Sequence, residues 1–323
     1  MLVQTESSTL ALAIDIGASS VKAAVIDVSD WRVAHRFASV PVRERTFAEL
    51  RSAVEGIVHD ALALAPTLRR VGISTTGSAN AQDVVISSGF FSGYANVNWL
   101  DILHPGSEGR IEVATVMNDG RAAALGTFLA DARVAGRNLV HFVVGTGIGG
   151  GMVWNGALFD GAHNFAGAYG HIKVDPYSGM TCVCGGRGCV EMFAAAPALA
   201  RLAGERGLTL CERGGRGVRE LGALARNGSD VAREIFVSAG RWLGVAVACV
   251  ANVCDPDVVT IGGGVVAAAY DSAGGNPYVE AAASAARTMV IPRIADHLVV
   301  VEASLLNDAA LIGAAARAAS RQK

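Results

Sequence analysis

The sequence predicts an α/β protein built from two lobes. Its 323 residues are enough for two domains. Short apolar runs typical of buried strands lie on both sides of a longer stretch with helical spacing, which favours a mixed sheet covered by helices. Three glycine-rich turns each follow an apolar run, and the backbone amides of such turns can hold phosphate. These observations predict an α/β nucleotide-binding protein.

Composition narrows the class of protein further. Hydrophobic residues make up 51% of the chain and charged residues 17%, so a large core can form. The formal net charge of −2 argues against the basic surface of a nucleic-acid-binding protein. No apolar run of membrane-spanning length is free of polar or glycine residues, and the first residues, MLVQTESSTL, do not resemble a signal peptide. We expect a soluble, cytoplasmic protein with neither nucleic acid nor a membrane among its partners.

The first lobe is expected to be a sheet with one long helix. The expected strands are Leu10 to Ile16, Val21 to Val28, Arg32 to Val40, Arg70 to Ser74 and Ile111 to Met117. Thr46 and Glu49 have the spacing of a capping box, which predicts that a helix starts there. Apolar residues from Phe47 to Leu62 follow at helical spacing. A second helix, Val231 to Val253, is largely apolar and is expected in the core or at a subunit interface.

The first glycine turn joins the first two expected strands. It contains Asp15, Gly17, Ser19 and Lys22 in a D-x-G-x-S-x-x-K pattern. Backbone amides and a hydroxyl in such a hairpin can hold phosphate, and the aspartate can hold magnesium through water. The pattern alone has low specificity, because other glycine hairpins show it too.

Two further glycine turns follow strands later in the chain. Gly145, Thr146, Gly147 and Gly149 follow the expected strand Leu139 to Val144. The next residues, MVWNGALF, continue as a strand and do not open a helix, so the dinucleotide-binding context fails. Gly262, Gly263 and Gly264 follow the expected strand Val258 to Ile261. Three such turns fit one nucleotide, although some of them could be tight turns only.

A cysteine cluster follows the second glycine turn. Cys182, Cys184 and Cys189 have C-x-C-x4-C spacing, and His171 lies upstream. Thiolate and imidazole ligands suit a closed tetrahedral zinc site, and the intervening glycines allow the chain to fold tightly. The alternatives are unpaired structural cysteines or a disulfide, and a disulfide is disfavoured in a cytosolic protein. Cys249 and Cys254 have no ligand spacing and are expected in the core.

Six segments in order resemble the ROK family, the bacterial sugar kinases and sugar-responsive repressors of the actin-like ATPase superfamily. The likeness is to its glucokinase-like and N-acetylmannosamine-kinase-like members. The segments are DIGASSVK, VGISTTG, MNDGRAAALG, VVGTGIGGGMVWNGALFDGAHNFAGAYGH with CVCGGRGCVE, DPDVVTIGGGV and LLNDAALIGAAARA. They span nearly the whole chain, and a chance match to all six in order is very improbable.

The resemblance implies a fold and an assembly. It implies a two-lobed actin-like (ribonuclease H-like) α/β fold with a cleft between the lobes and a structural zinc site. Residues 1–119 and 306–323 would form the smaller lobe, with the final helix packed back on it, and residues 120–305 the larger lobe. It also implies a homodimer through the larger lobe. The family's repressors carry a DNA-reading domain before the sugar-binding part, and a first strand at Leu10 is expected to leave no room for one.

The resemblance also implies an activity, which is ATP-dependent phosphorylation of a sugar, at its 6-hydroxyl, with Mg2+. Asp119 would be the general base that takes the proton from the sugar hydroxyl. Alternatively, Asp119 could be a surface aspartate or a helix-capping aspartate. Gly77, Asn118 and Glu191 would contact the sugar. His171 would bind zinc through one nitrogen and the sugar through the other, and the zinc would be structural.

One position departs from the family pattern. Kinases of the family usually read A-G-E-x-G-H where this chain reads Ala166 to His171, so Ala168 replaces a sugar-contacting glutamate. A charge-assisted hydrogen bond of about 1–3 kcal/mol is missing. The substrate could lack the hydroxyl that the glutamate binds, or carry an amino, acylamino or other bulkier group. Alternatively, the protein could be a weak kinase or a silent sugar-binding regulator. We favour an altered hexose, since the other site residues are retained.

Overall fold

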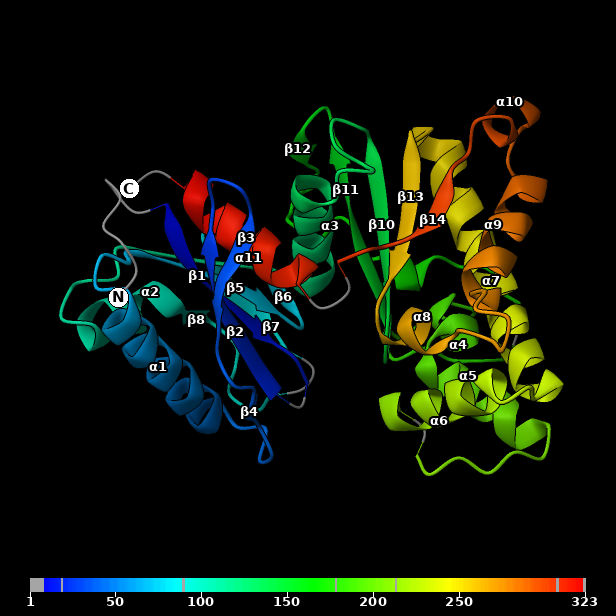
Figure 1. Cartoon of the computed structure of the whole chain (residues 1–323), viewed down its shortest axis with the longest axis horizontal. Helices are drawn as coiled ribbons and strands as arrows, with labels where there is room; N and C mark the ends of the chain where they lie inside the picture. The colour runs from blue at the N-terminus through cyan, green and yellow to red at the C-terminus, as the bar shows by residue number, and fades with distance from the viewer. Residues whose placement is uncertain are drawn as a thin grey trace. The chain divides into compact units, whose positions relative to one another are not determined.

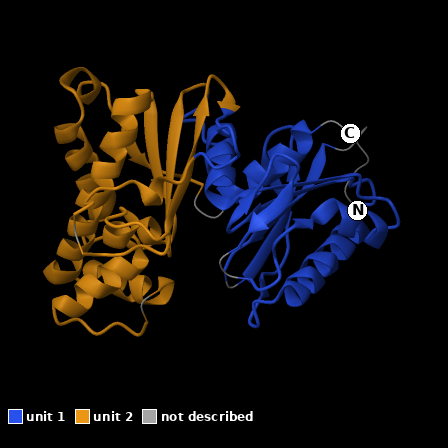
Figure 2. Ribbon diagram, turned by 180° about the vertical axis from the view of Figure 1, so that it is seen from behind, with its two compact units in different colours: residues 1–135, 158–166, 307–323 blue, residues 136–157, 167–306 orange. Residues whose placement is uncertain are grey.

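The computed structural model describes residues 9–18, 20–88, 91–177, 179–212, 214–305 and 308–321. The chain divides into two compact units, which are coloured separately in Figure 2. Unit 1 contains Met1–Ala135, Leu158–Ala166 and Asn307–Lys323, and unit 2 contains Gly136–Ala157 and Gly167–Leu306. Ser19, which belongs to the first predicted phosphate turn, lies outside the described residues.

Unit 1 is built on a mixed sheet with the order β3-β2-β1-β5-β9, to which β4 adds by pairing with β2 (Figure 1). These strands are β1 (Leu10–Ile16), β2 (Ser20–Asp27), β3 (Arg32–Arg36), β4 (Val40–Pro41), β5 (Arg70–Thr75) and β9 (Val113–Asn118). A small second sheet contains β6 (Ser78–Ala79), β7 (Val84–Ser87) and β8 (Val97–Asn98). The pairs β1–β2 and β2–β3 are antiparallel, while β1–β5 and β5–β9 are parallel. The five predicted strands are therefore confirmed, except that the third is divided into β3 and β4.

Helix α1 (Phe47–Leu64) begins where the predicted capping box placed it, but only the Thr46 half of the box is formed. The Thr46 side chain accepts a hydrogen bond of 3.2 Å from the Glu49 amide. The Glu49 carboxylate accepts from the amides of residues 43–45, instead of from Thr46, because the left-handed Arg45 (φ 54°) curls the preceding chain over the helix start. The buried face of α1, including Leu50, Val54 and Leu62, belongs to the apolar core under the sheet.

The remaining helices of unit 1 are α2 (Trp99–Gly106), α3 (Asp119–Ala130) and α11 (Ala309–Ser320). Glycines allow α11 to lie very close both to the sheet and to α3. A Cβ on Gly72 would lie 1.9 Å from the Ala314 carbonyl oxygen, and one on Gly313 would lie 1.9 Å from the Ala122 carbonyl oxygen. The final helix therefore belongs to unit 1. Because α3 packs against α11, α3 also belongs to unit 1, so the division falls after Ala135 and not at the expected residue 119.

Unit 2 is built on a second mixed sheet with the order β12-β11-β10-β13-β14. Its strands are β10 (Leu139–Val144), β11 (Ile148–Trp154), β12 (Ala157–Leu158), β13 (Val258–Gly262) and β14 (Val300–Glu302), and the chain passes into unit 1 at β12. The β10–β11 pair is antiparallel, which confirms that the second glycine turn leads into a strand. The β10–β13 and β13–β14 pairs are parallel.

The helices of unit 2 share one apolar core with this sheet. They are α4 (Glu191–Ala194), α5 (Ala196–Glu205), α6 (Gly215–Arg226), α7 (Asp230–Cys254), α8 (Gly264–Ala268), α9 (Pro277–Met289) and α10 (Pro292–Ala295), with the 3-10 helix η1 (Tyr169–His171). Helix α7 is long and apolar enough to cross a membrane by length and composition alone, but 61% of its most apolar window is buried. It packs along α9, and Gly240 and Gly244 admit the α9 backbone.

The prediction that Cys249 and Cys254 are core residues was wrong for Cys249, whereas Cys254 packs against the edge of the core. Cys249 is exposed and Cys254 is half-buried. Both lie in an apolar stretch, but α7 buries only one of its faces, and Cys249 falls on the other.

Candidate active site

Asp15 lies in β1 of unit 1, where the sheet aligns it with polar residues of both neighbouring strands. The register pairs Asp15 with Lys22 on β2 and with Ser74 on β5. The buried Ser74 hydroxyl donates a 2.9 Å hydrogen bond to Asp15 Oδ1. Burial raises the pKa of Asp15, and the Ser74 hydrogen bond and the Lys22 charge oppose that rise. Ser74 was not among the predicted site residues, although it is a polar residue directly after the run of residues 71–73.

The Asn118–Asp119 pair lies at the junction of β9 and α3. Asn118 caps α3, since its Oδ1 accepts from the amides of Gly120 (3.0 Å) and Arg121 (3.3 Å). Its Nδ2 donates to the Gly77 carbonyl oxygen (3.0 Å) and to Asp119 Oδ1 (2.9 Å). Asn118 therefore fixes the position of the Asp119 carboxylate from within unit 1.

Asp119 has the electrostatic surroundings of a base that works near neutral pH. Its Oδ1 accepts from the Gly120 amide at 2.8 Å and from Asn118. Burial and the nearby charge of Asp15 raise the pKa of Asp119 to about 6, against the opposing effect of these hydrogen bonds. A catalytic base is most effective when its pKa lies close to the working pH.

A buried arginine links the start of α3 to the segment Leu158–Ala166. Arg121 is 3% exposed and forms an ion pair with Asp160, which also pairs with Arg317 of α11 at 3.4 Å. Arg121 Nη1 also donates to the Asn164 carbonyl oxygen at 2.8 Å. These contacts hold the segment Leu158–Ala166 in unit 1. Arg121 itself follows the candidate base, Asp119, by two residues in the sequence. The spacing of apolar residues in the sequence did not predict these contacts of Arg121.

Glycines of the predicted phosphate turns fall into two groups. Crowded glycines are needed by the fold: a Cβ on Gly263 (φ 100°) would lie 2.4 Å from the Val144 carbonyl oxygen. The same holds for Gly77 (φ 105°), which was predicted to contact the sugar, because its Cβ would lie 2.1 Å from the Ser87 carbonyl oxygen. By contrast, a Cβ on Gly145 or Gly264 would meet no atom of the described residues within 4 Å. Packing does not require glycine at Gly145 or Gly264. The absence of a side chain at these two positions leaves the backbone accessible to a ligand.

Gly263 also brings two predicted turns together in unit 2. It contacts Val144, the last residue of β10, so the turn at Gly262–Gly264 lies beside the turn that starts at Gly145. In the second turn, the Gly145 amide donates to the Gly147 carbonyl oxygen at 2.9 Å. Gly149 lies in β11 and pairs with Val143.

The four predicted zinc ligands converge in unit 2. Their ligand atoms, one each from His171, Cys182, Cys184 and Cys189, all lie within 4.8 Å of one another. Cys184 Sγ lies 3.6 Å from Cys189 Sγ, and Cys182 Sγ lies 3.7 Å from His171 Nδ1. Zinc–sulfur bonds of 2.3 Å in a tetrahedron place ligand atoms about 3.8 Å apart. The donor set and its spacing therefore fit zinc.

Glu191 lies between this cluster and the glycine turn. It is the first residue of α4, and its Oε1 lies 2.8 Å from Cys182 Sγ and 3.5 Å from His171 Nδ1. A Cβ on Gly147 or Gly170 would lie 3.2 or 3.1 Å from Glu191 Oε2. Ala168, where the glutamate of the family pattern is absent, is exposed and caps η1.

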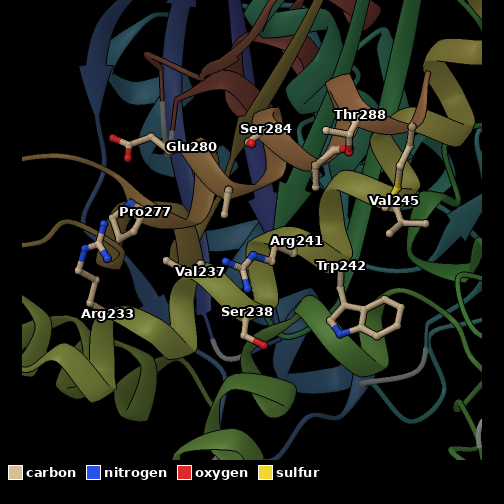
Figure 3. Close-up of a pocket in the computed structure, with 13 residues that line it drawn as sticks. Arg233, Val237, Ser238, Arg241, Trp242, Val245, Pro277, Glu280, Ser284 and Thr288 are labelled. Carbon is tan, nitrogen blue, oxygen red and sulfur yellow. The ribbon is translucent and has the colours of Figure 1, made fainter. Parts of the chain in front are cut away.

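A separate groove of about 660 Å³ lies between α7 and α9 of unit 2 (Figure 3). Arg241 and Trp242 of α7 and Glu280 and Ser284 of α9 are among the residues that line it. None of the predicted site residues lines this groove.

Comparison with known proteins identifies the family. The sequence profile of the ROK family matches residues 11–321. The chain belongs to the ROK family. Among ROK relatives, it is 30% identical to a glucokinase of Streptomyces coelicolor over 272 residues, covering 79% of this chain and 82% of the relative. It is 32% identical to an N-acetylmannosamine kinase of Citrobacter koseri over 259 residues, covering 79% of this chain and 83% of the relative.

A solved ROK structure extends the likeness to the fold. The crystal structure of a glucokinase from Streptomyces griseus in complex with glucose and AMPPNP superposes with a TM-score of 0.78. The two proteins are 27% identical, and the match covers 97% of this chain and all of the other. The α/β architecture with two mixed sheets is therefore that of ROK sugar kinases.

Proposed function

We propose that this protein is an ATP-dependent sugar kinase that phosphorylates a hexose or a modified hexose at the 6-hydroxyl. The observation that carries the proposal is the Asp119 carboxylate, which Asn118 holds at the start of α3 and whose pKa is raised to about 6. At neutral pH such a carboxylate is ionised and can accept the proton of an attacking hydroxyl. The relatives named glucokinase and N-acetylmannosamine kinase support a sugar as the acceptor.

The other site residues receive proposed roles from their chemistry. Asn118 and the Gly77 carbonyl oxygen position Asp119, and Asn118 also contributes to sugar binding. Glu191 accepts hydrogen bonds from sugar hydroxyls, and His171 offers them the ring nitrogen that does not face the cysteines. Phosphoryl transfer depends mainly on positioning and on charge neutralisation, which these groups and a metal ion provide.

ATP and Mg2+ are the proposed co-substrate and cofactor. Asp15 would hold Mg2+ through water, and Mg2+ would neutralise developing phosphate charge. Gly17, Ser19 and Lys22 are proposed for phosphate binding beside it. The open backbone at Gly145 and Gly264, with Thr146, Gly147, Gly149, Gly262 and Gly263, is proposed to bind the nucleotide.

Zinc is proposed as a structural ion bound by His171, Cys182, Cys184 and Cys189. It would fix the orientation of His171 and of the adjacent Glu191, so it would shape the sugar-binding groups without taking part in phosphate chemistry. The Glu191 contact with Cys182 supports this coupling.

Ala168 sets the proposed substrate preference. Without the carboxylate of the family pattern, glucose should be phosphorylated less well than a hexose modified at the position that the glutamate would contact. A tenfold preference corresponds to about 1.4 kcal/mol of transition-state discrimination. Ala168→Glu should shift kcat/KM toward glucose and lower it for the natural substrate. Equal preferences in both proteins would show that Ala168 does not determine specificity.

A catalytically silent sugar-binding regulator is the second candidate, and the replacement at Ala168 favours it. One experiment separates the two. ATP consumption is measured with a panel of hexoses, amino sugars and N-acyl sugars, and sugar binding is measured in parallel by calorimetry. ATP turnover above the sugar-free rate supports the kinase, and sugar binding without turnover supports the regulator.

A cytoplasmic homodimer completes the proposal, and the α7–α9 groove is its proposed contact surface. Met289, which lines the groove, is 50% exposed, and Val253 and Ile291 are 87% and 58% exposed. Arg241 and Glu280 are exposed and have no ion-pair partner among the described residues, so they could pair across a two-fold axis. Arg241→Glu should give monomers in light scattering, and adding Glu280→Arg should restore the dimer. Unchanged dimers in the single variant would exclude this surface.

A further inference from the structure

The backbone places Lys173 beside the cysteine cluster. Lys173 and Cys189 form an isolated antiparallel bridge, and the Val174 amide donates to the Gly188 carbonyl oxygen at 2.9 Å. Gly188 (φ 67°) permits this approach, since a Cβ there would lie 1.6 Å from the Asp175 carbonyl oxygen. The position of Lys173 is therefore fixed by the chain and does not depend on its own side chain.

The Lys173 amine reaches two of the thiols. Its Nζ lies 2.7 Å from Cys189 Sγ and 3.8 Å from Cys184 Sγ. The chain leaves room for it, because a Cβ on Gly186 would lie 2.5 Å from Nζ and 3.0 Å from Cε of Lys173. A lysine amine is a compact charge with three donors, so it can serve two sulfur atoms at once.

The positive charge of Lys173 would balance the charge of the proposed zinc site. Three thiolates, a neutral imidazole and Zn2+ carry a net charge of −1. One ammonium group beside the exposed Cys184 and the buried Cys189 would make the site neutral and would cover the sulfurs with hydrogen bonds. We propose that Lys173 is an outer-shell residue of the zinc site, which retains the metal by neutralising its thiolates. This proposal rests on the zinc site proposed above.

The test compares zinc retention among variants of the full-length protein. Zinc content is measured first by elemental analysis, and zinc transfer to a chromogenic chelator is then followed by absorbance. Lys173→Met removes the charge and keeps most of the stem, and Lys173→Arg keeps a cation. Arg187→Met is the matched control. Arg187 lies in the loop that carries the cysteines, and its cation has no contact with sulfur among the described residues.

Loss of an outer-shell partner typically lowers metal affinity 10–100-fold. Lys173→Met should therefore release zinc at least about tenfold faster than the unmodified protein, while Lys173→Arg and Arg187→Met stay within about threefold. Release at the unmodified rate in Lys173→Met, or equal acceleration in Arg187→Met, overturns the assignment of Lys173. Absence of zinc from the unmodified protein overturns the zinc site itself, so the two failures are distinguishable.

Gly186→Ala provides a second test that leaves the charge unchanged. The new Cβ should displace the Lys173 amine and accelerate zinc release in the unmodified background. In the Lys173→Met background the same substitution should have little further effect, because the amine whose displacement accelerates zinc release is absent there. Equal acceleration in both backgrounds shows that Gly186 acts independently of Lys173 and contradicts the proposed contact.

Discussion

Replacing the candidate base should stabilise the protein in a pH-dependent way while it greatly lowers the rate of catalysis. In Asp119→Asn the Oδ1 atom is kept, so it can still accept from the Gly120 amide and from Asn118. What changes is the ionisable carboxyl, whose pKa is raised from 3.8 to about 6 by burial and by Asp15. The folded protein therefore resists an ionisation that the unfolded chain undergoes freely.

The sign and size of the gain follow from this shift. Below about pH 4 the carboxyl is protonated in both states, so Asp119→Asn should show no gain from this source. Between pH 4 and pH 6 the unfolded chain loses the proton first, so the folded state of the unmodified protein loses stability and the gain of the variant grows. The shift corresponds to about 3 kcal/mol at most, and the partial exposure of Asp119 lowers the expected gain to about 1–2 kcal/mol at pH 7.

The assay is urea unfolding of the ligand-free protein at several pH values between 4.5 and 7.5. The measured quantity is the difference in unfolding free energy between Asp119→Asn and the unmodified protein. Asp60→Asn, which removes an exposed carboxylate on α1, is the control. In an Asp15→Asn background the gain should shrink, since the Asp15 charge is the second cause of the shift. A difference that stays constant with pH would refute the reasoning about the surroundings of Asp119.

Four further predictions concern the same molecule. Asp119→Asn should lower kcat at least about 10²-fold, as measured in a coupled assay. In the same assay, kcat/KM of the unmodified enzyme should rise as the pH increases through about 6, where Asp119 ionises. Cys184→Ser should contain less than one zinc per chain and should have a higher KM for sugar, because His171 and Glu191 lose their support. Gly72→Ala should lower Tm, by an amount corresponding to at least about 2 kcal/mol, because its Cβ would overlap the Ala314 carbonyl. Arg121→Met should cost about 1–3 kcal/mol in urea unfolding, because Asp160 loses one of its two arginine partners, and Arg121→Lys should cost less.

Local patterns predicted much of unit 1. The apolar runs of β1, β2 and β5 and the capping box of α1 appear where they were expected, because each depends on neighbours within a few residues. The spacing of three cysteines within eight positions likewise brought these candidate metal ligands together, since a short chain can close such a loop at little entropic cost.

Other parts of the site depend on pairings that no local pattern encodes. Ser74 reaches Asp15 across 59 residues of sequence because β1 and β5 are adjacent parallel strands. Arg121 meets Asp160 because the segment Leu158–Ala166 returns to unit 1 from the sheet of unit 2. Periodicity reports which face of an element is apolar, but it does not report which distant element covers that face.

The sequence by itself determined the family, most strands of the first sheet with the helix that follows them, the glycine turns and the candidate metal ligands, because these are properties of adjacent residues. Only the tertiary structure decided that α3 belongs with the first unit, that Cys249 faces outward and that Lys173 lies against two thiols. It also decided the pKa of Asp119, since burial and the charge of Asp15 act through space. Desolvation and Coulomb interactions depend on distances between groups, and the folded chain alone sets those distances.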